Sequence, residues 1–189
     1  MADELREVLT KSGVLREGHF LLTSGKHSDR YFEKFRILEQ PPVCVRFAVA
    51  IADHFRSAGV TAVCGPTTGG IIIAYEVARQ LGVRCIIAEK SEIGRKVGRG
   101  FRLAHEDRVL VVDDVLTTGG SIRETLAALV PSGAQVVGVG VYVDRSPGVD
   151  FGVPLFGACC QPVAAWEPSS CPLCQSGVAL EEPGRSGKK

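Results

Sequence analysis

The chain has 189 residues, 45% of them hydrophobic, which is enough for one domain with a substantial core and small appendages. Its 22 basic and 21 acidic residues nearly cancel, which argues against a protein that binds nucleic acid or a membrane surface through charge. No segment has the apolar length of a membrane span, and the N-terminus is a short amphipathic pattern rather than a signal peptide. Of the 7 cysteines, Cys44, Cys64 and Cys85 lie within apolar patterns, which predicts buried thiols in a reducing, cytoplasmic protein.

The first predicted elements are a helix over residues 3–11 and a hairpin over residues 18–35. The helix carries its apolar residues on one face, and the hairpin has apolar stretches on both sides of a Ser-Gly-Lys turn. The hairpin either covers one end of a core or presents aromatic rings and cations to a flat, anionic ring. The side chains that favour the second interpretation are Tyr31, Phe32, Lys26, Arg30 and Lys34.

Pro41 and Pro42 open a predicted helix that ends near Gly59, and a strand over residues 60–64 follows. The strand leads through Gly65-Pro-Thr-Thr-Gly-Gly into a helix over residues 71–81. In a doubly wound sheet such a loop lies at the carboxyl end of its strand, where ligands bind. Glycines there permit close approach of a diphosphate to backbone N–H groups, although a tight turn without ligand explains the pattern equally well.

A third strand is predicted over residues 83–88, followed by the segment EKSEIGRKVGRGFRL over residues 89–103. Cations alternate with glycines in this segment, and apolar anchors are few. It is either a solvated surface loop or a mobile cationic lid that closes over a polyanion, and its position between two candidate ligand loops favours the lid. Its cations are Lys90, Arg95, Lys96, Arg99 and Arg102, and His105 follows as an exposed turn residue.

The most specific stretch is RVLVVDDVLTTGGSI, over residues 108–122. Residues 109–112 are typical of a strand buried on both faces, and the run ends on Asp113 and Asp114 before a small-residue loop and a helix. The loop's N–H groups and hydroxyls form a phosphate receptor, and the carboxylates can hold sugar hydroxyls or the waters of a Mg²⁺ ion. An acidic turn without function is the simpler alternative. A Walker B acid would require a phosphate-binding lysine loop, and the chain has none.

A buried strand over residues 135–143 ends at Asp144 and Arg145, where the guanidinium suits a carboxylate ligand or a structural pair with its neighbour. Residues 153–156 and 163–166 are short candidate strands. Cys171 and Cys174 form a C-x-x-C, and with Cys159 and Cys160 upstream these thiols either bind zinc or remain reduced structural cysteines.

Residues 108–122 resemble the phosphoribosyl-diphosphate (PRPP) motif of the type I phosphoribosyltransferases. Three further strings, FLLTSGKHSDRYFEK, GPTTGG and VDRS, narrow the resemblance to the orotate phosphoribosyltransferase family over residues 18–146. The tail CPLCQSGVALEEPGR is similar to that of one branch of the family. The resemblance implies an α/β fold, with a mostly parallel central sheet flanked by helices and a small N-terminal hairpin or hood. It also implies a single domain over residues 1–189, divided into a hood segment (1–40), a PRPP-binding core (41–146) and a C-terminal segment with the C-x-x-C (147–189).

The family resemblance implies transfer of the 5-phosphoribosyl group from PRPP to N1 of orotate, which gives orotidine 5′-phosphate and diphosphate in de novo pyrimidine (UMP) biosynthesis. Mg²⁺ would enter with PRPP, without direct protein ligands, and the protein would be a homodimer whose subunits share lid residues. The implied catalytic residues are Lys90, Asp113 and Asp114, which also bind PRPP together with Val115, Leu116, Thr117, Thr118, Gly119, Gly120 and Ser121. The orotate residues are Thr117, Arg145, Tyr31 and Phe32, and the further lid cations are Arg95, Lys96 and Arg99.

The chain departs from the family pattern at several positions. Thr23, Thr67 and Thr68 stand where many members carry lysine or a lysine-containing loop, and the lid lacks the usual histidine. Base preference and the most important lid cation therefore stay open. A purine or other nucleobase phosphoribosyltransferase is the first alternative, against which Arg145 argues. A non-catalytic, PRPP-sensing regulator is the second, and the near-zero net charge gives it little support.

Overall fold

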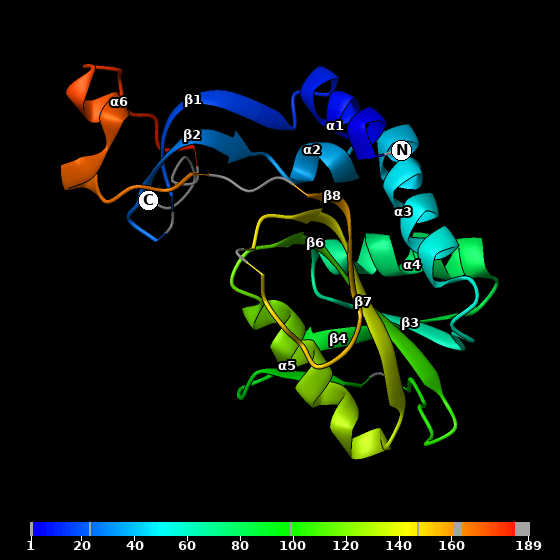
Figure 1. Cartoon of the computed structure of the whole chain (residues 1–189). Helices are drawn as coiled ribbons and strands as arrows, with labels where there is room; N and C mark the ends of the chain where they lie inside the picture. The colour runs from blue at the N-terminus through cyan, green and yellow to red at the C-terminus, as the bar shows by residue number, and fades with distance from the viewer. Residues whose placement is uncertain (1, 23, 99, 147, 161–163, 184–189) are drawn as a thin grey trace.

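The computed structural model describes residues 2–22, 24–98, 100–146, 148–160 and 164–183, and Figure 1 shows its course. A six-stranded sheet with the order β5-β4-β3-β6-β7-β8 forms the centre. All neighbouring strands are parallel except β5, which runs antiparallel to β4. The strands are β3 (Ala62–Pro66), β4 (Arg84–Lys90), β5 (Arg95–Val97), β6 (Arg108–Leu116), β7 (Gln135–Asp144) and β8 (Leu155–Cys160).

Helices cover both faces of this sheet, as Figure 1 shows. Helices α3 (Pro41–Phe55) and α4 (Gly69–Leu81) pack on one face, and α5 (Gly120–Leu129) packs on the other. The sequence of β6 explains why both faces of the sheet are buried. Leu110 and Val112 pack in the hydrophobic core under α3 and α4, while Val109 and Val111 pack in the core under α5. The predicted fold class, a mostly parallel sheet flanked by helices with a small N-terminal hairpin, is therefore confirmed.

Glycines in β7 allow α3 to lie close against the sheet. A Cβ atom added to Gly140 would lie 2.6 Å from the Ile51 Cγ2 atom, and one added to Gly138 would overlap the ring of Phe55. Both partners are on α3 and are buried. The run of glycine and valine in β7 thus sets the distance between the helix and the strand.

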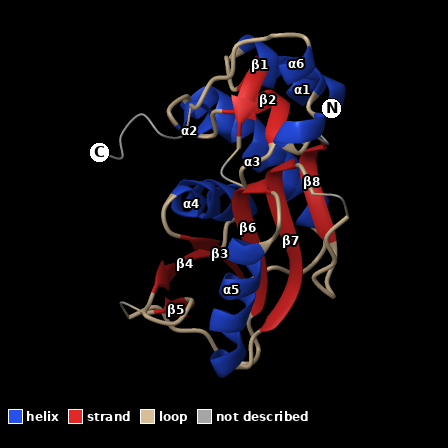
Figure 2. Cartoon of the chain, turned by 90° about the vertical axis from the view of Figure 1, so that its left-hand side faces the viewer, coloured by secondary structure: helices blue, strands red, loops and turns tan. Residues whose placement is uncertain are grey.

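A smaller layer lies beyond the carboxyl ends of the strands, as Figure 2 shows. It contains α1 (Ala2–Lys11), the antiparallel hairpin of β1 (Leu15–Leu21) and β2 (His27–Phe32), and the short α2 (Phe35–Leu38). The C-terminal residues return to this hairpin, where Glu181 bridges to Phe20 and Trp166 bridges to His27. The remaining short elements are η1 (Val130–Ser132), η2 (Pro168–Ser170) and α6 (Pro172–Gln175).

The structure differs from the sequence prediction in a few boundaries. Strand β6 continues through both aspartates to Leu116, because residues 113–116 keep pairing with β7. The last strand covers residues 155–160 rather than 153–156. Of the strand predicted over residues 163–166, Trp166 forms a single bridge and residue 163 lies outside the described residues. Within the described part of the chain, no helix is long and apolar enough to cross a membrane.

Candidate functional site

The candidate site lies where β3, β4, β6 and β7 end, under the hairpin. In open parallel sheets this carboxyl edge is the usual place for ligands, because the loops there leave a crevice. Asp113 and Asp114 are consecutive in β6 and are both buried. Successive residues of a strand point to opposite faces, so the two acids have different neighbours. Asp113 lies with the loop that leads into α5, and Asp114 lies with Lys34.

The loop after β6 forms a small hollow of about 100 Å³, and Asp113 is among the residues that line it. Whole small molecules bind in cavities of about 300–1,000 Å³, so this hollow suits a single group such as a phosphate. Gly119 has a φ of 81°, and a Cβ atom there would lie 2.9 Å from the ring of Phe151, so only glycine fits. Helix α5 begins at Gly120, which turns its unpaired N–H groups toward the loop. The hollow is lined by Asp113, Val115, Leu116, Thr117, Thr118, Gly119, Gly120, Ser121 and Ile122.

Asp113 has an unusual protonation equilibrium. Burial first, and then the negative charge of Asp114, raise the pKa of Asp113 to about 6. The N–H of Asp114 donates a hydrogen bond of 2.9 Å to the Asp113 carboxylate. This bond lowers the pKa of Asp113, but by less than burial and the charge of Asp114 raise it. A buried acid pair of this kind favours a ligand that brings hydroxyl donors or positive charge.

Lys34 links the hairpin to the acid pair, a contact that the sequence did not predict. Its Nζ atom lies 3.1 Å from the Asp114 carboxylate, although the two residues are 80 positions apart in the chain. The only sequence signal was the cluster of cations beside aromatic residues in the hairpin. That signal did not predict Asp114 as the partner of Lys34, because the contact depends on where the hairpin docks.

Arg145, Tyr31 and Phe32 come together as the sequence predicted for a base pocket. The Arg145 guanidinium carbon lies 4.9 Å from the centre of the Phe32 ring, a stacking arrangement typical of cation–π pairs. Burial lowers the pKa of Arg145 and raises that of Tyr31. Among the described residues, the buried Arg145 Nε atom has no hydrogen-bond partner, so the guanidinium has a donor to offer a ligand.

The predicted lid contains one cation that is already fixed in place. The side chain of Arg95 is 6% exposed and reaches the Thr67 carbonyl, the Ser121 hydroxyl (each 3.2 Å) and Glu124 (3.4 Å). It therefore joins the loop after β3 to the loop after β6. Lys90 and Lys96 are exposed and line an open hollow with Ser91, Glu92 and Ile93. Arg99, the remaining predicted lid cation, lies outside the described residues.

The structure also changes the grouping of the C-terminal cysteines. Cys159 belongs to the hydrophobic core, while Cys171 and Cys174 lie beside His19 and His27 of the hairpin. Among the described residues, the candidate metal ligands are therefore two cysteines and two histidines, and the upstream pair Cys159 and Cys160 is not part of the set. The histidines were not predicted, because the hairpin sequence gave no metal-ligand spacing with residues about 150 positions away. His105 is exposed, as the sequence predicted.

A mostly parallel sheet with an acid pair, a loop around a phosphate-sized hollow and an arginine stacked on an aromatic ring is the combination expected in a class of proteins that bind a sugar phosphate beside a flat anionic ligand. Comparison with known proteins agrees with this class. The model of the phosphoribosyl transferase domain family matches residues 36–169. The orotate phosphoribosyltransferase of Caldanaerobacter subterraneus subsp. tengcongensis is 44% identical over 183 residues, covering 96% of each chain.

A second relative, the orotate phosphoribosyltransferase of Thermotoga maritima, is 42% identical and covers 98% of this chain and 100% of its own. The crystal structure of orotate phosphoribosyltransferase from Aeropyrum pernix superposes with a TM-score of 0.71 at 29% identity, covering 82% of this chain and 93% of its own. The chain therefore belongs to the phosphoribosyltransferase family, and within it to the orotate phosphoribosyltransferases.

Proposed function

We propose that the protein transfers the 5-phosphoribosyl group of PRPP to N1 of orotate, with release of diphosphate, in pyrimidine biosynthesis. The observation that carries the proposal is the position of Arg145, stacked on Phe32 at the sheet edge that also holds the phosphate loop. A guanidinium with an unused donor fits the carboxylate of orotate, whereas a purine base or uracil offers no carboxylate to bind. The names of relatives that align over nearly the whole chain support the same reaction.

The acid pair and the loop after β6 have the chemistry to bind the ribose 5-phosphate part of PRPP. The 5-phosphate would accept hydrogen bonds from the backbone and hydroxyls of residues 117–121. The ribose hydroxyls would donate to Asp113 and Asp114. Lys34 lowers the cost of holding both carboxylates charged, because its ammonium group lies against Asp114.

The base would bind between the hairpin and Arg145. Tyr31 and Phe32 provide the aromatic surface, and Thr117 follows β6 at the same edge. In the reaction, N1 of orotate forms a bond to C1 of the ribose as the bond from C1 to the diphosphate oxygen breaks. No protein base is needed when orotate binds with N1 deprotonated, since the electron pair of N1 forms the new bond directly.

The departing diphosphate carries most of the developing negative charge, and the lid cations would stabilise it. Lys90, Lys96 and Arg99 are the candidates, and Arg95 would hold the loops that receive the diphosphate. A Mg²⁺ ion that enters with PRPP would neutralise part of that charge. The buried acid pair fits a nearby dication, because burial and mutual repulsion raise the pKa of Asp113 and a cation would favour its charged form.

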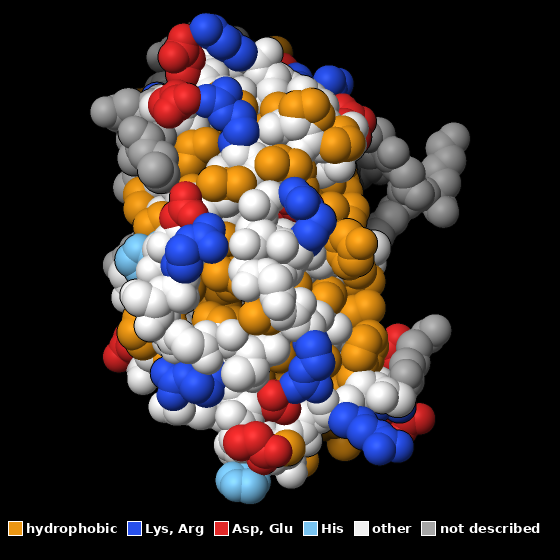
Figure 3. Space-filling view, turned by 90° about the vertical axis from the view of Figure 1, so that its right-hand side faces the viewer, with side chains coloured by type: hydrophobic (Ala, Val, Ile, Leu, Met, Phe, Trp, Pro, Cys, Tyr) orange, Lys and Arg blue, Asp and Glu red, His pale blue; other side chains and the backbone are white. Residues whose placement is uncertain are grey.

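The proposal includes a homodimer in which each lid serves the partner's site. An apolar groove of about 320 Å³ lies along α2, α3 and α4 and supports a subunit contact. Ile72 and Tyr75, which help to line it, are 46% and 65% exposed. Figure 3 shows hydrophobic side chains gathered toward the right of one face of the molecule. We further propose that residues 1–189 form one domain and that the protein is cytoplasmic, consistent with seven cysteines that form no disulfide.

The first experiment is an absorbance assay with PRPP, Mg²⁺ and orotate, run beside identical mixtures that contain adenine, guanine or uracil. We expect loss of orotate absorbance and no turnover of the other bases. Turnover of a purine or of uracil in place of orotate would overturn the substrate assignment. Binding of PRPP without turnover of any base would instead indicate a regulator.

A further inference from the structure

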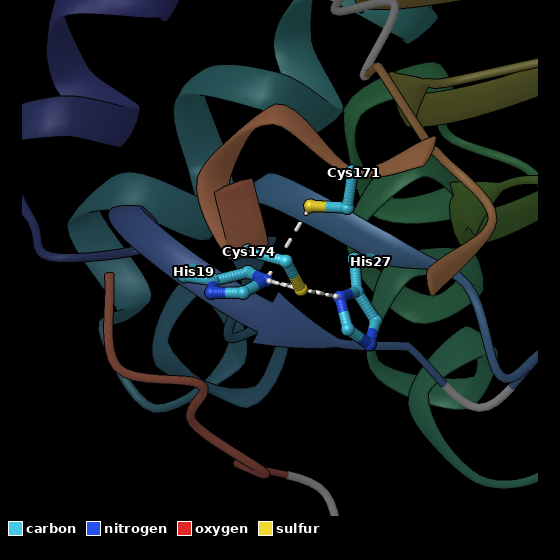
Figure 4. Close-up of side chains that lie close together, drawn as sticks. All are labelled: His19, His27, Cys171 and Cys174. Carbon is cyan, nitrogen blue, oxygen red and sulfur yellow. Dashed lines mark hydrogen bonds between the residues drawn. The ribbon is translucent and has the colours of Figure 1, made fainter. Parts of the chain in front are cut away.

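Four metal-ligating side chains from distant parts of the chain converge outside the phosphoribosyl site, as Figure 4 shows. His19 lies on β1 and His27 on β2, while Cys171 precedes α6 and Cys174 lies within it. Their ligand atoms all lie within 4.8 Å of one another. His19, His27 and Cys171 are buried at 2%, 6% and 0% exposure, and Cys174 faces solvent.

Four distances between these atoms are close to the edges of a zinc coordination tetrahedron, and the two that involve His27 are slightly shorter than those edges. With Zn–N bonds of about 2.0 Å and Zn–S bonds of about 2.3 Å, the ligand atoms of a tetrahedral site lie about 3.3–3.8 Å apart. The Cys171 and Cys174 sulfurs lie 3.5 and 3.7 Å from His19 Nε2. His27 Nδ1 lies 3.2 Å from the Cys174 sulfur and 3.0 Å from His19 Nε2.

The hydrogen bonding of His19 orients a lone pair into the cluster. Its Nδ1 atom lies 2.8 Å from the Val178 carbonyl oxygen. A carbonyl oxygen can only accept, so Nδ1 carries the hydrogen and donates it. In the neutral ring Nε2 is then unprotonated and faces the other three ligand atoms. This backbone support of the second ring nitrogen is a common feature of histidine ligands to zinc.

We propose that His19, His27, Cys171 and Cys174 bind one structural zinc ion. Two thiolates and two neutral imidazoles fill all four positions of the tetrahedron, so the ion has no open position for substrate or catalytic water. Zinc is the divalent ion that this mixed set of sulfur and nitrogen ligands favours. The site is separate from the acid pair and the phosphate loop, and it needs no part of the proposed reaction.

The zinc ion fastens the C-terminal segment across the hairpin. Backbone hydrogen bonds attach this segment on both sides, at Trp166 with His27 and at Glu181 with His19 and Leu21. Between these attachments lies α6, which has 4 residues and is too short to be stable alone. The ion connects α6 to both strands, and the free energy of metal binding therefore stabilises the docked segment. Tyr31 and Phe32 lie on the same β2 strand as His27, so the zinc ion also stabilises the strand that presents them.

The test is metal analysis of the full-length, tag-free chain purified without chelators. We expect about one zinc ion per chain, and a loss of nearly all of it in the Cys171→Ser/Cys174→Ser variant. Cys160→Ser, which removes an exposed thiol outside the cluster, is the matched control and should keep the zinc. His27→Gln tests the histidine side of the site, with the exposed His105→Gln as its control.

Cobalt substitution of the wild-type chain gives a second readout that does not depend on any variant folding. Co²⁺ bound to this ligand set should show the intense visible bands of tetrahedral coordination and a thiolate charge-transfer band.

Chelation should lower the Tm of the wild-type protein by about 5 °C or more and should leave the Tm of a folded Cys171→Ser/Cys174→Ser variant unchanged. The proposal is wrong if the chain stays zinc-free after incubation with zinc and cobalt gives no tetrahedral bands. It is also wrong if thiol titration of the purified chain shows that Cys171 and Cys174 form a disulfide.

Discussion

Arg145 is the residue on which the proposed choice of substrate depends. Its backbone is fixed by a 2.9 Å hydrogen bond from its N–H to the Leu116 carbonyl, so the end of β7 is tied to the end of β6. Its side chain is stacked on Phe32 and partly buried, which holds the guanidinium in one direction. Desolvation makes its interaction with a ligand carboxylate stronger than it would be in water.

We predict that Arg145→Ala lowers kcat/KM for orotate by about 10- to 150-fold, because a hydrogen bond to a charged group contributes about 1.5–3 kcal/mol. Arg145→Lys should recover only part of the loss, because lysine cannot form a bidentate pair. Steady-state kinetics with varied orotate and saturating PRPP measure the effect. An unchanged kcat/KM for orotate, with KM for PRPP raised instead, would contradict the assignment.

The buried charge of Asp113 opposes the stability of the fold at neutral pH. Its folded pKa, about 6, lies above the value of about 3.9 expected for an aspartate in the unfolded chain. The folded state therefore binds the proton more tightly, and stability falls as the pH rises from about 4 to about 6. Above that range the full cost of the buried charge, about 3 kcal/mol, is present.

Asp113→Asn should therefore raise the free energy of unfolding by about 1–3 kcal/mol at pH 8 and change it little at pH 4, while activity is lost. Urea unfolding at the two pH values measures this. Asp107→Asn is the control with the opposite sign, because the hydrogen bond from Arg84 lowers the pKa of Asp107. That carboxylate stabilises the fold at neutral pH, and its contribution is lost as the pH falls through its folded pKa. Equal stability of Asp113→Asn and the wild type at pH 8 would contradict the account.

At the scale of elements, the contact between α3 and β7 depends on glycine. A Cβ atom at Gly138 would overlap the buried Phe55 ring and lie 3.1 Å from the Pro154 carbonyl oxygen. A rigid ring and a backbone carbonyl cannot move away cheaply, so the helix and the strand would have to separate.

We predict that Gly138→Ala lowers the free energy of unfolding by about 1–3 kcal/mol. Gly98→Ala is the matched control, because its Cβ atom would lie at an ordinary 3.6 Å from Glu89 Oε2, and it should stay within about 0.5 kcal/mol of the wild type. Chemical denaturation of the three proteins measures the difference. A Gly138→Ala protein as stable as the control would show that α3 shifts without cost.

At the scale of the whole molecule, the exposed apolar residues of α4 are the surface on which the proposed dimer would depend. Ile72→Glu/Tyr75→Glu should convert a particle of about twice the 20.1 kDa chain mass to the monomer. Activity should fall by about 10²–10³-fold if each lid serves the partner's site. Light scattering after size exclusion measures the mass. Val130→Glu, at a position that is 75% exposed at the end of α5, is the control.

A complementary experiment tests the shared lid directly. Lys90→Ala and Asp114→Asn chains, each poorly active alone, should regain activity when mixed, because one site of a mixed dimer then contains both intact residues. A wild-type chain that is monomeric yet fully active would reject both the dimer and the shared lid.

The sequence alone predicted most of the elements of the sheet, and it supplied the residues proposed for the centre of the site. Residues 108–122 contain an unbroken apolar run, then two acids, then a Thr-Gly-rich loop. The apolar run predicts a strand that is buried on both faces, and the loop predicts the start of a helix. Both predictions therefore come from 15 consecutive residues. Arg145 was proposed in the same way, from its position just after a buried strand. The strand and helix predictions succeed because they depend only on residues that are neighbours in the sequence, and such residues stay neighbours in the folded chain.

Only the tertiary structure decided which distant residues meet. It placed Lys34 against Asp114, directed the buried Arg95 to the Ser121 hydroxyl, and brought His19 and His27 to the two C-terminal cysteines. No spacing in the chain encodes these contacts, because each depends on how the hairpin, the lid or the C-terminal segment docks on another element. Such docking is set by packing between surfaces far apart in sequence, and that information becomes visible only in the folded molecule.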